Sequence, residues 1–179
     1  VHALVGENGA GKSTLIKIIA GVEQPDAGSV FYFNGEKITG LTPQKAIKQG
    51  VAVIYQEISL FPNLTVAENI VMDYESKGWL HWREMRRQAA QILKEMGCDW
   101  DVNEELGHLS LGRQQLVALA RAIHCQAKIV VMDEPTSALS QNEVKILFQA
   151  IDRLRQQAGI IYISHKLEEI FQIADRVTV

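Results

Sequence analysis

The sequence predicts an α/β fold with a mainly parallel sheet, and three observations carry this prediction. Short apolar runs alternate with helical segments over the second half of the chain, as in a sheet covered on both faces. A glycine-rich loop joins the first apolar run to a helix. An Asn-Gly pair at 34–35 marks a small antiparallel excursion from the sheet.

The glycine-rich loop at 6–13 reads G-x-x-x-x-G-K-S, with an apolar run at 3–5 before it and a helix-like run at 15–20 after it. Glycines let successive backbone N–H groups turn toward a polyphosphate. Lys12 brings a positive charge to the outer phosphates, and the Ser13 hydroxyl can ligate Mg²⁺. A chance turn with this pattern is expected in roughly 1% of chains of this size. The loop therefore predicts nucleotide binding.

The first half of the chain continues with short elements. Runs at 29–33 and 36–38 flank the Asn-Gly pair and predict a hairpin. A helix is expected from Pro43 to about Gln49, and a buried strand at 51–55 follows it.

Residues 59–108 have a helical pattern. The sequence Thr-Val-Ala-Glu at 65–68 is a capping box, which marks the start of a helix. A further helix is indicated by apolar residues at 3.6-residue spacing, which are Trp82, Met85, Ala89, Ile92, Leu93 and Met96. We expect these residues to pack against neighbouring helices, in a helical subdomain at 59–108 inserted into a core of 1–58 and 109–179.

The remaining chain alternates between helices and strands. The expected helices are 111–125, 141–157 (begun by a second capping box at Ser140) and 167–173, and the expected strands are 129–132, 160–163 and 176–179.

Two carboxylates, Asp133 and Glu134, directly follow the strand at 129–132. Ligands of open parallel sheets lie at the carboxyl ends of the strands, so this pair is expected to face the bound nucleotide. Asp133 suits the Mg²⁺ shell, and Glu134 suits a base that orients an attacking water. The alternative, a solvated Asp-Glu turn, is disfavoured once the phosphate loop is present.

The run Leu-Ser-Leu-Gly-Arg-Gln-Gln at 109–115 lies at the start of a helix. Ser110 is expected to cap the helix, and Gly112 to leave its first turn open to an anion.

Composition gives little support to a nucleic-acid partner, because the net charge is −3 and such partners leave a basic footprint. No apolar run approaches the roughly 20 residues that span a bilayer. Cys98 and Cys125 form no disulfide framework, which suggests a reducing compartment, and both are expected to be packing residues. The other histidines are expected to be structural, namely His2, His81, His108 and His124. Since the chain opens on Val1 and stops in a strand-like run, we expect a domain truncated at both ends.

Taken in order, the motifs resemble those of the ATP-binding-cassette (ABC) ATPases: the phosphate loop, Gln56 after a strand, Leu-Ser-x-Gly-x-Gln at 109–114, Asp133-Glu134, Ser-Ala-Leu at 137–139 and His165. The resemblance covers all of 1–179 and implies one ABC domain with a P-loop NTPase core that binds ATP and Mg²⁺. It implies an ATP-binding set of Gly6, Glu7, Asn8, Gly9, Ala10, Gly11, Lys12, Ser13, Thr14, Ser110 and Gly112. Glu134, His165 and Gln56 are the implied catalytic residues, and Ser13, Gln56 and Asp133 the implied metal ligands.

In this family two cassettes face each other head to tail, so Ser110 and Gly112 would touch a γ-phosphate held by the partner cassette. The run at 55–70 looks like the sugar-importer branch, and the intact motifs resemble its N-terminal cassette. Departures from the common pattern are Leu111, Arg113 and Ser140.

The resemblance implies an importer ATPase, peripheral on the cytoplasmic face of the inner membrane. Its partners would be a second cassette, transmembrane permease subunits and, indirectly, a periplasmic sugar-binding protein, with no nucleic acid. Two alternatives remain open. A non-transport ABC ATPase acting on DNA or ribosomes is disfavoured by the short helical insert and the acidic balance. A regulatory module without turnover is disfavoured by the intact Glu134 and His165.

Overall fold

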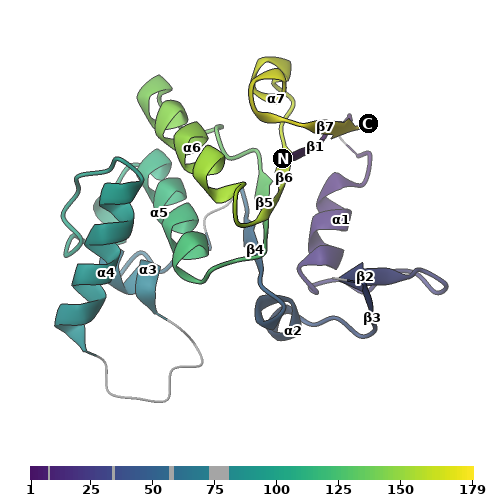
Figure 1. The fold of residues 1–179 in the computed structure, drawn as a ribbon, viewed down its shortest axis with the longest axis horizontal. Helices are drawn as coiled ribbons and strands as arrows, with labels where there is room; N and C mark the ends of the chain where they lie inside the picture. The colour runs from purple at the N-terminus through teal and green to yellow at the C-terminus, as the bar shows by residue number, and fades with distance from the viewer. Residues whose placement is uncertain (8, 34, 57–58, 73–80) are drawn as a thin grey trace.

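The computed structural model describes residues 1–7, 9–33, 35–56, 59–72 and 81–179. Its centre is a five-stranded sheet in the order β4-β5-β6-β1-β7, and every pair of neighbours is parallel (Figure 1). The strands are β1 (His2–Leu4), β4 (Val51–Ile54), β5 (Ile129–Asp133), β6 (Gly159–Ile163) and β7 (Arg176–Thr178). The predicted α/β class and parallel sheet are confirmed.

Helices cover both faces of the sheet. On one face lies α1 (Lys12–Ile19), with α2 (Pro43–Lys48) near the sheet's end; on the other lie α5 (Leu111–His124) and α6 (Gln141–Leu154) (Figure 1). Side chains alternate accordingly along β5, where Val131 joins the apolar cluster of α1, while Val130 and Met132 join that of α5 and α6. This two-sided burial explains why the strand reads as a continuous apolar run.

The predicted hairpin is present. Strand β2 (Phe31–Phe33) pairs antiparallel with β3 (Glu36–Ile38), with Phe31 opposite Ile38. Gly35 has a φ of +82°, the left-handed conformation that favours glycine in such a turn. Asn34 lies outside the described residues.

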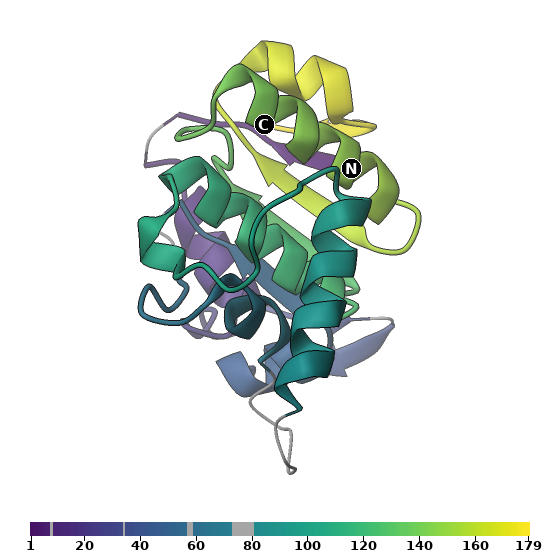
Figure 2. The ribbon, with the colours of Figure 1, turned by 90° about the vertical axis from the view of Figure 1, so that its left-hand side faces the viewer.

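The helices within 59–108 are α3 (Val66–Val71), α4 (Trp82–Glu95) and the short 3₁₀ turn η1 (Leu106–His108). The capping box of α3 is confirmed, since the Thr65 backbone N–H donates to Glu68 Oε2 at 2.7 Å. Figure 2 views the molecule from the side of α4, with α5 and α6 between α4 and the sheet. Buried side chains of α3 and α4 share one apolar cluster with α5. This shared cluster fixes the orientation of α5, whose first residues form the candidate signature.

The α4 stripe is confirmed in its centre, where Met85, Ala89 and Leu93 are buried, whereas Trp82 in the first turn is half exposed. Helix α6 ends at Leu154, three residues before the predicted end at 157. The chain turns there because Gly159 must reach the Lys128 carbonyl and begin β6. Cys98 is buried as expected, but the packing role predicted for Cys125 is wrong, because this residue caps α5 at the surface.

The end of the chain follows the prediction, with α7 (Leu167–Ile173) between β6 and β7. Among the described residues, no helix combines the length and apolar character that crossing a membrane requires.

Candidate nucleotide-binding site

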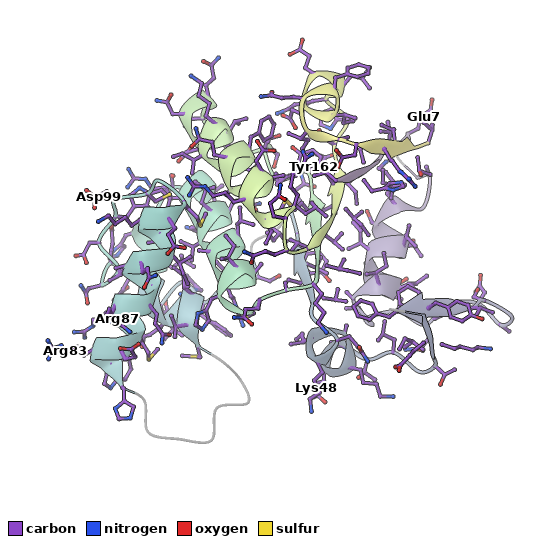
Figure 3. All side chains as sticks on the ribbon, in the orientation of Figure 1. Glu7, Lys48, Arg83, Arg87, Asp99 and Tyr162 are labelled. Carbon is purple, nitrogen blue, oxygen red and sulfur yellow. The ribbon has the colours of Figure 1, made fainter. Side chains whose placement is uncertain are left out.

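The candidate phosphate loop connects β1 to α1. Gly9 and Gly11 have φ values of +89° and +90°, which only glycine adopts without strain. Gly11 precedes the first residue of α1, and no side chain in the described part of the chain caps this helix, so the first-turn N–H groups face the loop. Glu7 lies beside the upper end of α1 (Figure 3). Asn8 was predicted to belong to the loop and lies outside the described residues.

Lys12 folds back across the loop. Its Nζ donates to the carbonyl oxygens of Gly6 at 2.6 Å and of Glu7 at 2.9 Å. A hollow beside the loop is lined in part by Gly6, Gly11 and Lys12. The ammonium group is therefore held at the loop by two carbonyl oxygens.

The register of the sheet brings three predicted sites to one edge. Leu4, the last residue of β1, pairs with Ile163 of β6, and Ile163 pairs with Asp133 of β5. The loop after β1, the carboxylates at the end of β5 and the segment after β6 therefore lie at the same level of the sheet.

Asp133 is half-buried at this edge. Burial raises the pKa of its carboxyl, the neighbouring Glu134 raises it further, and Lys12 opposes them. The same carboxylate acts on Tyr55: burial raises the pKa of the Tyr55 hydroxyl, Lys17 lowers it, and Asp133 raises it.

Glu134 and His165 are in direct contact. Glu134 Oε1 lies 3.0 Å from His165 Nδ1, although the two residues are far apart in the sequence. Glu134 has a φ of +47°, and its backbone N–H donates to the Ile163 carbonyl at 2.9 Å. The backbone of Glu134 is thus tied to the strand that carries His165.

Gln56 follows β4 and is exposed. Its carbonyl and that of Tyr55 both accept a hydrogen bond from Gln115 Nε2, each at 3.3 Å. Gln115 is 4% exposed, and its Oε1 has no hydrogen-bond partner among the described residues. We did not single out Gln115 from the sequence, although it ends the run at 109–115. It joins α5 to the segment that carries Gln56.

Ser110 caps α5 as predicted, since its Oγ accepts from the Arg113 N–H at 3.3 Å. The expectation that Gly112 leaves the first turn open is corrected, because Gly112 is buried. A Cβ at this position would lie 2.7 Å from Glu143 Oε2 and 3.1 Å from the Ala138 carbonyl oxygen. A side chain here would have to displace the Glu143 carboxylate and press on the Ala138 carbonyl, so Gly112 allows close packing against the start of α6.

The candidate signature is held by neighbours from two elements. Ser110 Oγ donates to Glu143 Oε1 at 3.4 Å, and Glu143 also accepts from the Ser140 N–H and hydroxyl at 2.8 and 2.7 Å. The Arg113 guanidinium lies 5.2 Å from the centre of the Trp100 ring, a cation–π distance. This contact gives a structural reason for an arginine at this position.

The predicted site residues therefore divide into two groups. Lys12, Asp133, Glu134 and His165 share one edge of the sheet. Ser110 and Gly112 belong to the start of α5, and α1 and α5 lie on opposite faces of the sheet (Figure 1).

The described residues include no group of three or more His, Cys, Asp or Glu side chains that could hold a metal ion by itself. Mg²⁺ at nucleotide sites is bound by one or two protein ligands together with substrate phosphates and water. Ser13, in the first turn of α1, and the half-buried Asp133 suit such a shell.

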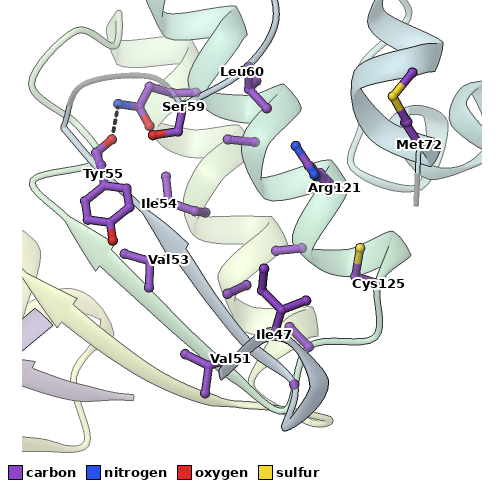
Figure 4. A pocket seen from close by; sticks show the side chains of 16 residues that line it. Ile47, Val51, Val53, Ile54, Tyr55, Ser59, Leu60, Met72, Arg121 and Cys125 are labelled. Carbon is purple, nitrogen blue, oxygen red and sulfur yellow. Dashed lines mark hydrogen bonds between the residues drawn. The ribbon is translucent and has the colours of Figure 1, made fainter. Parts of the chain in front are cut away.

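A second hollow is lined in part by Gln115 (Figure 4). This groove is mostly apolar and is formed by the end of α2, strand β4 and one side of α5, with Leu60 and Met72 at its border. Ile47, which is 62% exposed, contributes to its wall. Tyr55, which directly precedes Gln56, also lines this groove.

A phosphate loop after β1, with an acidic pair after β5, defines a P-loop nucleotide-binding domain. The ABC transporter family model matches residues 1–137, and the chain belongs to this family.

The chain is similar to curated proteins along its whole length. It is 47% identical to a ribose import ATP-binding protein of Geobacillus kaustophilus, over all of this chain and 37% of the relative. It is 44% identical to an arabinose import ATP-binding protein of Burkholderia cenocepacia, again over all of this chain and 36% of the relative. The chain thus spans a little over a third of the length of these relatives.

Solved structures agree with the fold. The chain matches the dimeric structure of the bacterial ABC transporter cassette MJ0796 with a TM-score of 0.83 and 26% identity, over 98% of this chain and 78% of that one. It matches the post-hydrolysis dimer of the same cassette, bound to ADP and Pi, with a TM-score of 0.80 and 26% identity, over 94% of this chain and 75% of that one.

The Glu143 cap yields a pH prediction. Hydrogen bonds from the Ser140 hydroxyl, which outweigh a small burial effect, lower the pKa of Glu143 below its ordinary value of 4.5. Glu143→Gln is expected to reduce the free energy of unfolding at pH 7 by roughly 0.5–1 kcal/mol. Because the folded-state pKa is lowered, this stabilisation is present above pH 4.5 and is lost as the pH falls through the folded value.

Urea unfolding of wild type and variant at pH 7 and near pH 4 measures the difference. The exposed Glu36→Gln, outside any helix cap, is the control. A difference that stays constant or grows on acidification contradicts the assignment.

Proposed function

We propose that this chain is an ATP-binding and ATP-hydrolysing cassette of an ABC importer for a sugar. The observation that carries the proposal is the 3.0 Å contact between Glu134 and His165, at the sheet edge from which the Lys12 loop also leaves. The sugar-import names of the relatives support the cargo class. They also favour transport over the alternative of a nucleic-acid or ribosome ATPase.

The chain's own residues divide the work as follows. The β- and γ-phosphates replace the Gly6 and Glu7 carbonyls as acceptors for Lys12. Ser13 and Asp133 would hold Mg²⁺, with Gln56 at the same shell, and the ion would supply positive charge that offsets the charge on the phosphates. Glu134 accepts a proton from the attacking water, and His165 orients Glu134 toward the γ-phosphate.

A second cassette completes the site in this proposal. Ser110 is exposed at the start of α5, on the face of the sheet opposite α1, so it suits a nucleotide held by the loop of a partner. Head-to-tail pairing would supply each nucleotide with one phosphate loop and one signature. The dimeric structures of the similar cassette MJ0796 support this arrangement.

The groove beside Gln56 is the proposed docking place for a transmembrane permease. Its apolar wall suits a short apolar segment of the permease, and Gln115 connects the wall to the carbonyls of Tyr55 and Gln56. The cassette would lie peripherally on the cytoplasmic face of the inner membrane. A periplasmic sugar-binding protein would act on it only through the permease. We also propose that 59–108 is a helical subdomain inserted into a core of 1–58 and 109–179.

A pair of variants tests the nucleotide site in the intact protein. Glu134→Gln is expected to keep ATP affinity within about threefold and to lower turnover at least about 100-fold, because the amide cannot accept the proton. Lys12→Ala is expected to weaken ATP binding itself, because it removes a charge-assisted contact to the phosphates. Calorimetric titration and phosphate release measure the two effects. Normal hydrolysis by Glu134→Gln would exclude this residue as the base.

The docking groove is tested by Ile47→Glu. A carboxylate on the apolar wall is expected to weaken association with the permease at least about tenfold, because docking would bury a charge without a partner. ATP turnover of the isolated cassette protein should stay within about twofold. The control is Val22→Glu, which is 57% exposed and does not line the groove. Equal binding of the permease by both variants would reject this groove as the dock.

A further inference from the structure

A buried carboxylate lies beneath the Glu134–His165 pair. Glu169, on the first turn of α7, is only 9% exposed. Burial of a charge is costly unless hydrogen bonds and an opposite charge compensate it.

Four donors reach this carboxylate. Oε1 accepts from Thr136 Oγ1 at 2.7 Å and pairs with Lys166 Nζ at 3.1 Å. Oε2 accepts from the Tyr162 hydroxyl at 2.8 Å and from Ser164 Oγ at 3.1 Å. Tyr162 projects from β6 inside the molecule and is fully buried (Figure 3).

The direction of the hydrogen bonds in this network is fixed by the charge of Glu169. Burial alone would raise the pKa of the Glu169 carboxyl, but hydrogen bonds from Thr136, Tyr162 and Lys166 outweigh it and lower the pKa. Burial and the contact with Glu169 raise the pKa of the Tyr162 hydroxyl. Glu169 is therefore ionised, the hydroxyls donate to it, and Lys166 Nζ also donates to Thr136 Oγ1 at 3.1 Å.

Two of these donors adjoin the catalytic pair. Thr136 is two residues after Glu134, and it is 3% exposed. Ser164 directly precedes His165, and its Oγ also accepts from the Lys166 N–H at 3.0 Å. One carboxylate thus holds both chain segments from which Glu134 and His165 project.

The backbone of Glu134 needs such support. Its φ of +47° is a conformation that side-chain-bearing residues rarely adopt and that persists only when the surroundings impose it. The Ile163 carbonyl holds the residue on one side, and the Ser137 N–H donates to the Glu134 carbonyl at 3.1 Å. The Thr136 bond to Glu169 anchors the turn that these contacts form.

We propose that Glu169 is a positioning residue for ATP hydrolysis, which holds Glu134 and His165 in contact through Thr136 and Ser164. The proposal rests on the proposed function. In this proposal, Glu169 touches neither the nucleotide nor the attacking water. Loss of the carboxylate would let the two segments separate while the phosphate loop stays intact.

The test compares Glu169→Gln with Glu168→Gln in the intact protein. Glu168 is the exposed neighbour on the same helix, so both variants remove one negative charge from α7. Glu169→Gln is expected to lower kcat roughly 10- to 100-fold, as displacements near a reacting centre do. ATP affinity and the number of nucleotides bound per chain should stay unchanged. Glu168→Gln should stay within about twofold of wild type in all three quantities.

If Glu169 served folding alone, Glu169→Gln would lower the number of nucleotides bound per chain by the same factor as turnover. That result would overturn the proposal. If Glu169→Gln does not fold, Thr136→Val removes the hydroxyl while preserving shape. It is expected to lose turnover at unchanged ATP affinity, and Thr136→Ser should restore turnover. Full turnover by Thr136→Val would overturn the proposal.

A double variant shows whether Glu169 acts on turnover through the contact of Glu134 with His165 or independently of it. With His165→Ala already present, Glu169→Gln should lower kcat by less than about threefold, because residues that act as a unit are not additive. If the double variant instead loses kcat by the product of the two single losses, the proposal is overturned. Absence of turnover in the wild-type protein would reject the proposed function instead, so the two failures are distinguishable.

Discussion

The parallel pairing of β1, β6 and β5 is the constraint on which the site depends. Because Leu4, Ile163 and Asp133 lie in register across three strands, each strand ends at the same level. Chain segments that are remote in sequence therefore leave the sheet together, with an ammonium group, two carboxylates and an imidazole among them. The apolar side chains on both faces stabilise this register, since a slip by one residue would exchange the faces.

Around this edge, single polar side chains connect neighbouring segments. Glu169 joins the turn after β5 to the end of β6, Glu143 joins the start of α6 to the start of α5, and Gln115 joins α5 to the segment after β4. Each of them holds a segment that carries a proposed nucleotide-site residue. In the proposed ATPase, two carboxylates and an amide would thus hold the segments that carry the nucleotide-site residues.

Much of this could be predicted from the sequence, because the signals are local. The phosphate loop, the Asn-Gly hairpin and the capping boxes of α3 and α6 depend on a few adjacent residues. The alternation of apolar strands with helices predicted the parallel sheet. From that sheet followed the expectation that Asp133 and Glu134 lie at the strand ends.

The rest depends on contacts between distant segments. Nothing in the local pattern distinguishes the buried Glu169 from the exposed Glu168, since only the approach of Thr136 and Tyr162 makes the first a partner. The packing of Gly112 against Glu143 and the early end of α6 likewise follow from tertiary contacts.

A crystal structure of the intact protein with a non-hydrolysable ATP analogue and Mg²⁺ tests the central claim most directly. The account predicts phosphates on the loop, with Lys12 Nζ moved from the Gly6 and Glu7 carbonyls to phosphate oxygens. It also predicts that Glu134 and His165 stay in contact and face the γ-phosphate. A nucleotide bound elsewhere, or a Glu134 side chain turned away from the γ-phosphate with its His165 contact broken, would contradict it.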